Sequence, residues 1–352
     1  MTASLKSLLG TDIPLIQAPM AGVQGSALAL AVSNAGALGS LPAAMLTPEQ
    51  LRNELQALRV GTGRPFNVNF FCHTPPVPDP AREAAWRAAL APLYAEAGLD
   101  ISTVPTGAGR VPFSAEVADL IEPFRPPVVS FHFGLPAPDL LARVKDSGAQ
   151  VLSSATTVDE ARWLVQHGAD AVIAQGLEAG GHRGMFLTED VTTQVSTLAL
   201  LPQIVRAVNV PVIAAGGIAD AAGVAAALAL GAAGVQVGTA YLLCPEATTS
   251  AVHRAALQGE SARHTALTNV FTGRPARGIV NRVMRELGVL CETAPAFPLA
   301  TAAMAPLRAW GEQHGIGDFS PLWLGQNASG CQAVAAAELT RSLAQGFAGR
   351  FG

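Results

Sequence analysis

The chain has 352 residues, half of them hydrophobic, with 22 basic and 26 acidic residues and a formal net charge of −4. This length is enough for one large core or two smaller ones, and the charge balance, without any basic block, argues against a nucleic-acid partner. Lys6 and Lys145 are the only lysines, so Schiff-base chemistry loses most of its candidates.

The cysteines Cys72, Cys244, Cys291 and Cys331 are widely spaced and form no CxxC pair. This pattern argues against a disulfide framework and a zinc site and is typical of the reducing cytosol. No apolar run in the first twelve residues is long enough for a signal peptide. Residues 210–244 are apolar over more than a membrane span, but glycine and polar residues interrupt them, which predicts strand, helix and strand. We therefore expect a cytoplasmic protein without a membrane partner.

Short β-branched segments alternate with helical segments rich in alanine and leucine. A helix is predicted over 47–59, capped by Thr47, and another over 157–168, capped by Thr157 and ended by Gly168. The predicted strands are residues 13–20, 36–41, 65–71, 128–134, 149–155, 170–176, 210–217 and 234–240. Eight strands separated by helices predict an α/β protein with a TIM-type (β/α)8 barrel rather than an open sheet.

Two segments exceed the minimal repeat of such a barrel. Residues 72–127 predict a long insertion after the third strand, with a helix over 79–98. The residues that follow the eighth strand predict helices and loops. We expect residues 1–258 to form the barrel and residues 259–352 to form a helical segment that covers its active site.

Function in a barrel of this type depends on the residues where strands end and loops begin. The glycine pairs after the seventh and eighth strands favour phosphate binding through backbone N–H groups, although such a pair alone is more often a tight turn. His132 lies between two phenylalanines and, taken alone, fits a hydrogen-bonded core residue. The strand-end candidates are Asn69, His132, Gln175, His182, Gly216–Gly217 and Gly238–Thr239.

His182 is the main candidate for a catalytic residue, because it lies on the glycine-rich segment GLEAGGHRG, residues 176–184. A glycine run indicates close backbone approach or positive φ, and a structural histidine has little to pack against there. The other histidines are expected at a helix end (His167) or at the surface (His73, His253, His264 and His314). The chain lacks HExxH, a Walker loop, GxSxG and a GxGxxG after a strand, which argues against metal, nucleotide and serine-hydrolase sites of those types.

Six segments in order over residues 13–246 resemble the nitronate monooxygenase family, formerly called 2-nitropropane dioxygenases, and its class I branch. They are IQAPMAG, NVNFFCH, VSFHFGLP, AQGLEAGGHRG, PVIAAGGI and GVQVGTAYLLCPE. The resemblance implies a flavin-dependent oxidoreductase whose barrel binds FMN without covalent attachment and without a metal. It implies oxidation of alkyl nitronates, with propionate 3-nitronate as a candidate, by O2 to carbonyl compounds and nitrite.

By position, the resemblance makes His182 the catalytic residue and His132 a second histidine that faces the substrate. A neutral nitroalkane must lose its α-proton before oxidation, which suits a histidine that titrates near neutral pH; a nitronate would only be bound and oriented. Asn69 and Gln175 would bond the flavin ring. The residues that the resemblance places beside FMN are Met20, Ala21, Gly22, Asn69, Gln175, Gly180, Gly181, Gly216, Gly217, Gln236, Val237, Gly238 and Thr239.

The C-terminal third departs from the family's pattern. Phe297, Thr301 and Ala305 stand where two tyrosines and a lysine are expected in the substrate pocket. This departure predicts a preference for uncharged alkyl nitronates over carboxylate-bearing ones, unless an arginine such as Arg277 or Arg308 reaches the pocket.

Two other functions remain open. An FMN-dependent NAD(P)H:quinone reductase or enoyl-acyl-carrier-protein reductase would share much of the glycine pattern and would be reduced by NAD(P)H. A barrel that binds a phosphate ligand without redox chemistry, such as a lyase or a ligand-sensing protein, would take up no FMN.

Overall fold

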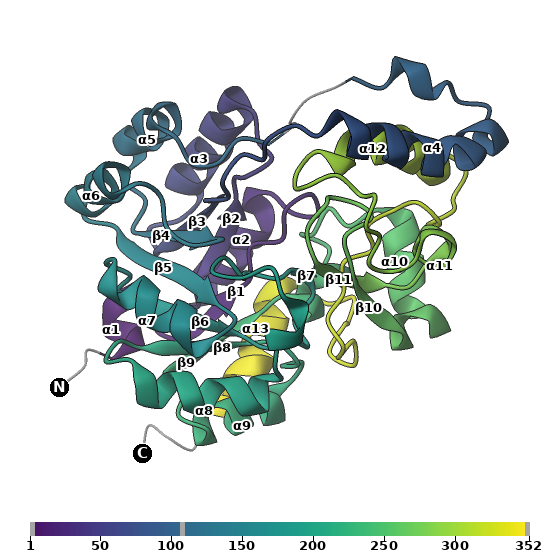
Figure 1. Ribbon diagram of the computed structural model, residues 1–352. Helices are drawn as coiled ribbons and strands as arrows, with labels where there is room; N and C mark the ends of the chain where they lie inside the picture. Colours follow the sequence, from purple (N-terminus) through teal and green to yellow (C-terminus); the bar gives the residue numbers. More distant parts are fainter. Residues whose placement is uncertain (1–3, 106–109, 349–352) are drawn as a thin grey trace.

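The protein is a (β/α)8 barrel with a second, smaller group of helices beside it; the computed structural model describes residues 4–105 and 110–348 (Figure 1). Eight parallel strands pair in the order β1-β9-β8-β6-β5-β4-β3-β2. A parallel bridge from Ile16 to Leu38 joins β1 to the chain just before β2, so the barrel is nearly closed. The strands are β1 (Leu15–Gln17), β2 (Gly39–Pro42), β3 (Phe66–Phe71), β4 (Val128–His132), β5 (Gln150–Ala155), β6 (Ala171–Gln175), β8 (Val212–Ala215) and β9 (Gly234–Val237). Each falls on a strand predicted from the sequence, which confirms the fold class.

A helix follows every strand of the barrel. After the last strand, this position is taken by a helix near the C-terminal end, α13, which packs against α2 and α9. The helices of the ring are α2 (Ser26–Asn34), α3 (Pro48–Gly61), α5 (Ala115–Ile121), α6 (Pro138–Asp146), α7 (Val158–Gln166), α8 (Thr197–Ala207), α9 (Ala221–Ala229) and α13 (Ala336–Ala344). As predicted, the Thr47 hydroxyl accepts from Gln50 N to begin α3, and the Thr157 hydroxyl accepts from Glu160 N to begin α7.

Helix α1 (Leu5–Leu9) closes one end of the barrel. Leu5 and Leu9 share an apolar cluster with residues that begin strands, such as Val128 and Ala171. Because these residues start their strands, α1 covers the N-terminal ends and leaves the C-terminal ends open for a site.

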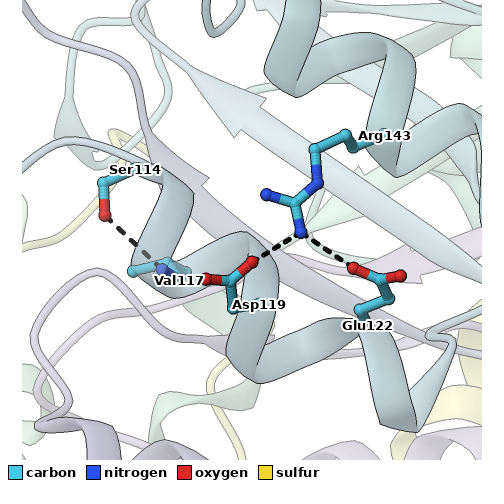
Figure 2. Close-up of polar contacts among 5 residues, drawn as sticks. All are labelled: Ser114, Val117, Asp119, Glu122 and Arg143. Atoms are coloured by element: carbon cyan, nitrogen blue, oxygen red, sulfur yellow. Dashed lines mark hydrogen bonds and ion pairs between the residues drawn. The ribbon is translucent and has the colours of Figure 1, made fainter.

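The segment between β3 and β4 contains two helices with different partners. Helix α4 (Pro80–Ala97) packs on α12 (Ala300–Gln313) away from the barrel, whereas α5 contacts α3 and α6 within the ring (Figure 1). Arg143 of α6 donates to Asp119 of α5 at 2.6 Å and to Glu122 at 2.8 Å, and the Ser114 hydroxyl caps α5 by accepting from Val117 N (Figure 2). Such exposed ion pairs orient the two helices and contribute little stability.

Helix α4 and most of the residues between β9 and α13 build the structure beside the barrel. It includes α10 (Ala251–Gln258), α11 (Arg282–Leu287) and α12, and Trp86, Met284, Met304 and Phe319 are part of its apolar core. A small antiparallel sheet joins β10 (Thr265–Thr268), β11 (Ala276–Ile279) and β7 (Gly181–His182), in the order β10-β11-β7. The short 3-10 helices are η1 (Ile101–Thr103), η2 (Glu122–Phe124), η3 (Val191–Thr193), η4 (Thr239–Leu243), η5 (Glu260–Arg263) and η6 (Gln345–Phe347). No helix in the described ranges is both long and apolar enough to cross a membrane.

Candidate active site

The C-terminal ends of the strands open into a cavity of about 270 Å³. Segments from the barrel form one side of this cavity, and the β10–β11 connection, α10 and α12 contribute to the other. Every site residue predicted from the sequence lines it: Met20, Ala21, Gly22, Asn69, His132, Gln175, Gly180, Gly181, His182, Gly216, Gly217, Gln236, Val237, Gly238 and Thr239. The structure therefore brings these dispersed residues together, while the roles given to them stay predictions.

The two positions before His182 require glycine for different physical reasons. A Cβ on Gly180 would lie 2.5 Å from the backbone nitrogen of Gly325, so this position needs glycine to pack against the C-terminal part of the chain. Gly181 has φ +70° and a Cβ there would meet no atom within 4 Å, so its requirement is conformational. Clearance for a ligand, which was expected for both glycines, is therefore not needed to explain Gly180.

Glu178 fixes the start of the same loop. Its carboxylate accepts from Thr197 N at 2.8 Å and from the Thr197 hydroxyl at 2.9 Å, and thereby caps α8. A carboxylate at a helix N-terminus satisfies free N–H groups and interacts favourably with the helix dipole. The glutamate of the glycine-rich segment therefore anchors the loop.

The ends of β8 and β9 form the part of the cavity expected to bind phosphate. Gly216 and Gly217 have φ of 117° and 74°, and among the described residues their backbone N–H groups donate to no acceptor. The Thr239 hydroxyl accepts from Gly325 N at 3.0 Å and keeps its own proton to donate. Asn327, which the sequence did not single out, donates to the Gly217 carbonyl at 3.0 Å.

His182 is held through its carbonyl oxygen and its ring. Gln175 Nε2 lies 3.0 Å and His132 Nε2 lies 3.1 Å from the His182 carbonyl oxygen. The ring Nε2 lies 2.9 Å from the hydroxyl of Thr272 in the β10–β11 connection. Four aromatic rings, those of Phe71, Phe133, Phe297 and Trp323, have centroids between 5.4 and 6.1 Å from the centroid of the His182 ring.

These surroundings favour a neutral imidazole. Burial lowers the pKa of His182 well below its ordinary value of 6.5, and repulsion from Arg110 and Arg274, and from His132 and His73 when they are protonated, lowers it further. The sequence-based picture of a histidine that titrates near neutral pH is thus modified: His182 is neutral at pH 7 and can accept a proton. An anion bound in the cavity would raise the pKa of His182 again.

The neighbouring polar side chains are mostly engaged within the protein. His132 places Nδ1 3.1 Å from Ser154 Oγ and Nε2 on the His182 carbonyl, so both ring nitrogens have partners. Gln175 also accepts from Gly184 N at 2.7 Å, while the Asn69 amide donates to Ser130 and leaves its own amide oxygen without a described partner. His132 and Gln175 thus position His182 in addition to lining the cavity.

Arg183 supports the loop from behind. Its side chain is fully buried and donates to the carbonyls of Gly176 and Gln175, each at 2.7 Å, and to Gln194 Oε1 at 2.9 Å. Burial lowers its pKa to about 9. Because these partners are neutral oxygens, a positive charge remains directly behind the end of β6.

The family model described as nitronate monooxygenase matches residues 2–346. The chain belongs to the nitronate monooxygenase family. It is 43% identical to the nitronate monooxygenase of Pseudomonas aeruginosa, over 98% of this chain and 99% of that protein, and 41% identical to that of Paraburkholderia phytofirmans, over 97% and 93%. The family makes it an oxidoreductase, and the family is flavin-dependent in general.

Solved structures agree with this nitronate monooxygenase fold. Nitroalkane oxidase from Streptomyces ansochromogenes has a TM-score of 0.88 and 38% identity, covering 99% of this chain and 98% of that one. FabK from Thermotoga maritima has a TM-score of 0.73 and 28% identity, covering 99% and 97%. The nitronate monooxygenase barrel is thus shared with proteins that carry different names.

The wall in which this chain departs from its family's pattern contains arginine. Thr301 and Ala305 line the cavity, and so do Arg110 and Arg308. Arg308 pairs with Glu312 at 2.8 Å, while no described carboxylate forms an ion pair with Arg110. Arg277 does not line the cavity; it donates to the Leu177 carbonyl at 2.9 Å and to Thr265.

Two histidines expected at the surface are buried. His73 packs edge-on against Phe297, with centroids 4.8 Å apart, and His253 lines the cavity. The sequence-based placement was wrong for both, because the structure beside the barrel covers them. His167 ends α7 as predicted, and His264 and His314 are exposed. In the part of the chain that the structure describes, no three His, Cys, Asp or Glu side chains are grouped to hold a metal ion.

Proposed function

We propose that this protein is an FMN-dependent nitronate monooxygenase that oxidises nitronates with O2 to carbonyl compounds and nitrite. The observation that carries the proposal is the position of His182, a neutral imidazole with four aromatic rings around it, in the cavity at the glycine-rich strand ends. A cytoplasmic location is part of the proposal and is supported by four cysteines that form no disulfide.

The cavity suits a flavin mononucleotide. Gly216 and Gly217 offer free backbone N–H groups, and the Thr239 hydroxyl adds a donor next to them, as binding of a terminal phosphate requires. The lining also includes apolar and aromatic side chains, such as Met20 beside Gly238 and Phe71 beside His182, which suit a flat ring system. Bound FMN would supply the redox chemistry: acceptance of electrons from the substrate and their transfer to O2.

His182 would act differently on two forms of the substrate. With a neutral nitroalkane, the neutral imidazole would take the α-proton, and the resulting nitronate would be the counter-ion of the imidazolium. With a nitronate, the histidine would only bind and orient. Neutral nitroalkanes belong in the proposal because a structural relative is named a nitroalkane oxidase.

The arginines of the outer wall change the expected range of substrates. Arg110 and Arg308 together carry two positive charges against the single carboxylate of Glu312. The sequence predicted a preference for uncharged nitronates unless an arginine such as Arg308 reached the pocket. Arg308 does line the cavity, and Arg110 adds a second positive charge. We infer that the enzyme accepts nitronates that carry a second anionic group, such as propionate 3-nitronate.

A visible spectrum tests the function. The purified protein is expected to be yellow, to release one FMN and no FAD on heating, and to lose flavin absorbance when a nitronate is added without oxygen. Stoichiometric FAD, or no flavin after reconstitution, would refute the cofactor.

The alternative is an FMN-dependent NAD(P)H reductase, which the likeness to FabK favours. Anaerobic mixing with NADH separates the two functions. Fast bleaching by NADH together with no bleaching by a nitronate would establish the reductase.

A further inference from the structure

His182 presents one ring nitrogen to a hydroxyl and the other to the cavity. Nε2 lies 2.9 Å from Thr272 Oγ1. Nδ1 hydrogen-bonds to no described residue, and protein atoms do not enclose it completely. Since His182 lines the cavity, Nδ1 is the ring nitrogen available to a bound molecule.

The two contacts of the Thr272 hydroxyl favour one tautomer of His182. The hydroxyl has one proton to donate, and it contacts both His182 Nε2 and, at 3.4 Å, the Arg274 carbonyl oxygen. A carbonyl oxygen can only accept, so the threonine proton belongs on that contact. The His182 contact is then satisfied only if Nε2 donates to Thr272. The opposite tautomer, with the proton on Nδ1, would leave one of the two contacts unmade.

We propose that Thr272 is a positioning residue that holds His182 as the Nε2–H tautomer, so that the Nδ1 lone pair takes the α-proton of a neutral nitroalkane. The inference rests on the proposed function. In this step the Cα–H bond breaks, its electron pair stays on the substrate as the nitronate, and the proton forms a new N–H bond at Nδ1.

A hydroxyl suits this task better than a carboxylate would. The charged or titratable groups that face His182 are Arg110 before α5, His132 on β4, Arg274 between β10 and β11, and His73 after β3, and none is acidic. A carboxylate on Nε2 would stabilise the imidazolium before substrate arrives. Thr272 is buried and neutral, so it fixes the ring while the base stays unprotonated, and Nε2–H can donate to it in either charge state.

The tautomer can be observed directly. In the holoprotein labelled with 15N-histidine, two-bond 15N–1H correlation spectra at pH 7.5 identify which nitrogen of His182 is protonated, with His182→Asn to assign the signals. We expect a protonated Nε2 and an unprotonated Nδ1. A protonated Nδ1 would overturn the inference whatever the enzyme oxidises.

Kinetics separate positioning from packing. Thr272→Val removes the hydroxyl at nearly constant volume and should lower kcat/KM for nitroethane by about fivefold to tenfold, the value of one hydrogen bond. For ethyl nitronate the loss should stay below about twofold, because no proton is abstracted. Thr272→Ser keeps the hydroxyl and should retain activity, and the acidic limb of the nitroethane pH profile, which reports protonation of His182, should move only in the valine variant.

Thr249→Val is the matched control. Thr249 is buried, its hydroxyl has no partner among the described residues, and it does not line the cavity. Equal losses on nitroethane and ethyl nitronate in Thr272→Val, or a serine variant as impaired as the valine variant, would contradict the positioning role. If the wild-type protein oxidised neither compound, the proposed function would fail, and the spectra would still decide the tautomer.

Discussion

Replacement of Arg110 by glutamine tests how the enzyme recognises a second anionic group. Arg110 lines the cavity, and its guanidinium carbon lies 5.6 Å from the centroid of Phe297, which itself packs against the His182 ring. Burial, with a contribution from Arg308, lowers the pKa of Arg110 to about 10, so it remains charged at neutral pH. No described carboxylate pairs with it.

The size of the effect follows from this unpaired charge. A hydrogen bond to a charged group contributes about 1.5–3 kcal/mol, which corresponds to about tenfold to a hundredfold in kcat/KM. Arg110→Gln should therefore lose about this factor on propionate 3-nitronate and change little on propyl-2-nitronate. Arg308→Gln is a less clean test, because it also leaves Glu312 without its cation.

The assay compares kcat/KM for the two nitronates at one pH and one ionic strength, with Arg206→Gln on the exposed face of α8 as a control. Equal losses on both nitronates would mean that Arg110 holds the nitro group that they share. No loss on either would remove Arg110 from recognition. In both cases the preference for uncharged alkyl nitronates, which the missing lysine predicts, would stand.

Three further outcomes are expected. His182→Asn should keep the flavin and lower turnover of neutral nitroalkanes by about 10²–10⁴-fold while affecting nitronates much less; equal losses would show that His182 binds rather than abstracts. Gly180→Ala forces a Cβ to within 2.5 Å of the Gly325 backbone, so urea unfolding should show a loss of about 1–3 kcal/mol, whereas Gly63→Ala, with nothing within 4 Å, should be nearly neutral. Burial lowers the pKa of His132 and of His253 from 6.5 to about 4, so the unfolded chain takes up protons first as the pH falls. Stability should be complete above about pH 6.5 and fall by about 2 kcal/mol per histidine at pH 5; His253→Gln should flatten this dependence, and an equal effect from the exposed His314→Gln would contradict the assignment.

The sequence predicted the barrel well because each of its strands is a continuous buried segment flanked by turn residues. Asn69, Gln175 and Gly216 could be placed near one another because parallel strands of a barrel end on the same face. The sheet formed by β7, β10 and β11 was not expected, since its strands have two to four residues and show no periodicity. Thr272 belongs to this sheet's connection, so its contact with His182 could not be inferred from spacing.

The positions of two titratable residues, Arg110 and His253, could not be predicted from the sequence either. Arg110 comes from the long segment between β3 and β4 and His253 from α10, where local pattern favours a solvated residue, yet both line the cavity in the folded chain. The residues proposed to bind the reactive centre thus lie on the regular part of the fold and are predictable from it. The residues that would select the substrate lie on the added part, where lysine can be lost at one position and positive charge supplied from another. The absence of one family residue therefore does not show that the enzyme has lost a substrate preference. That conclusion also needs the positions of the added segments in the structure.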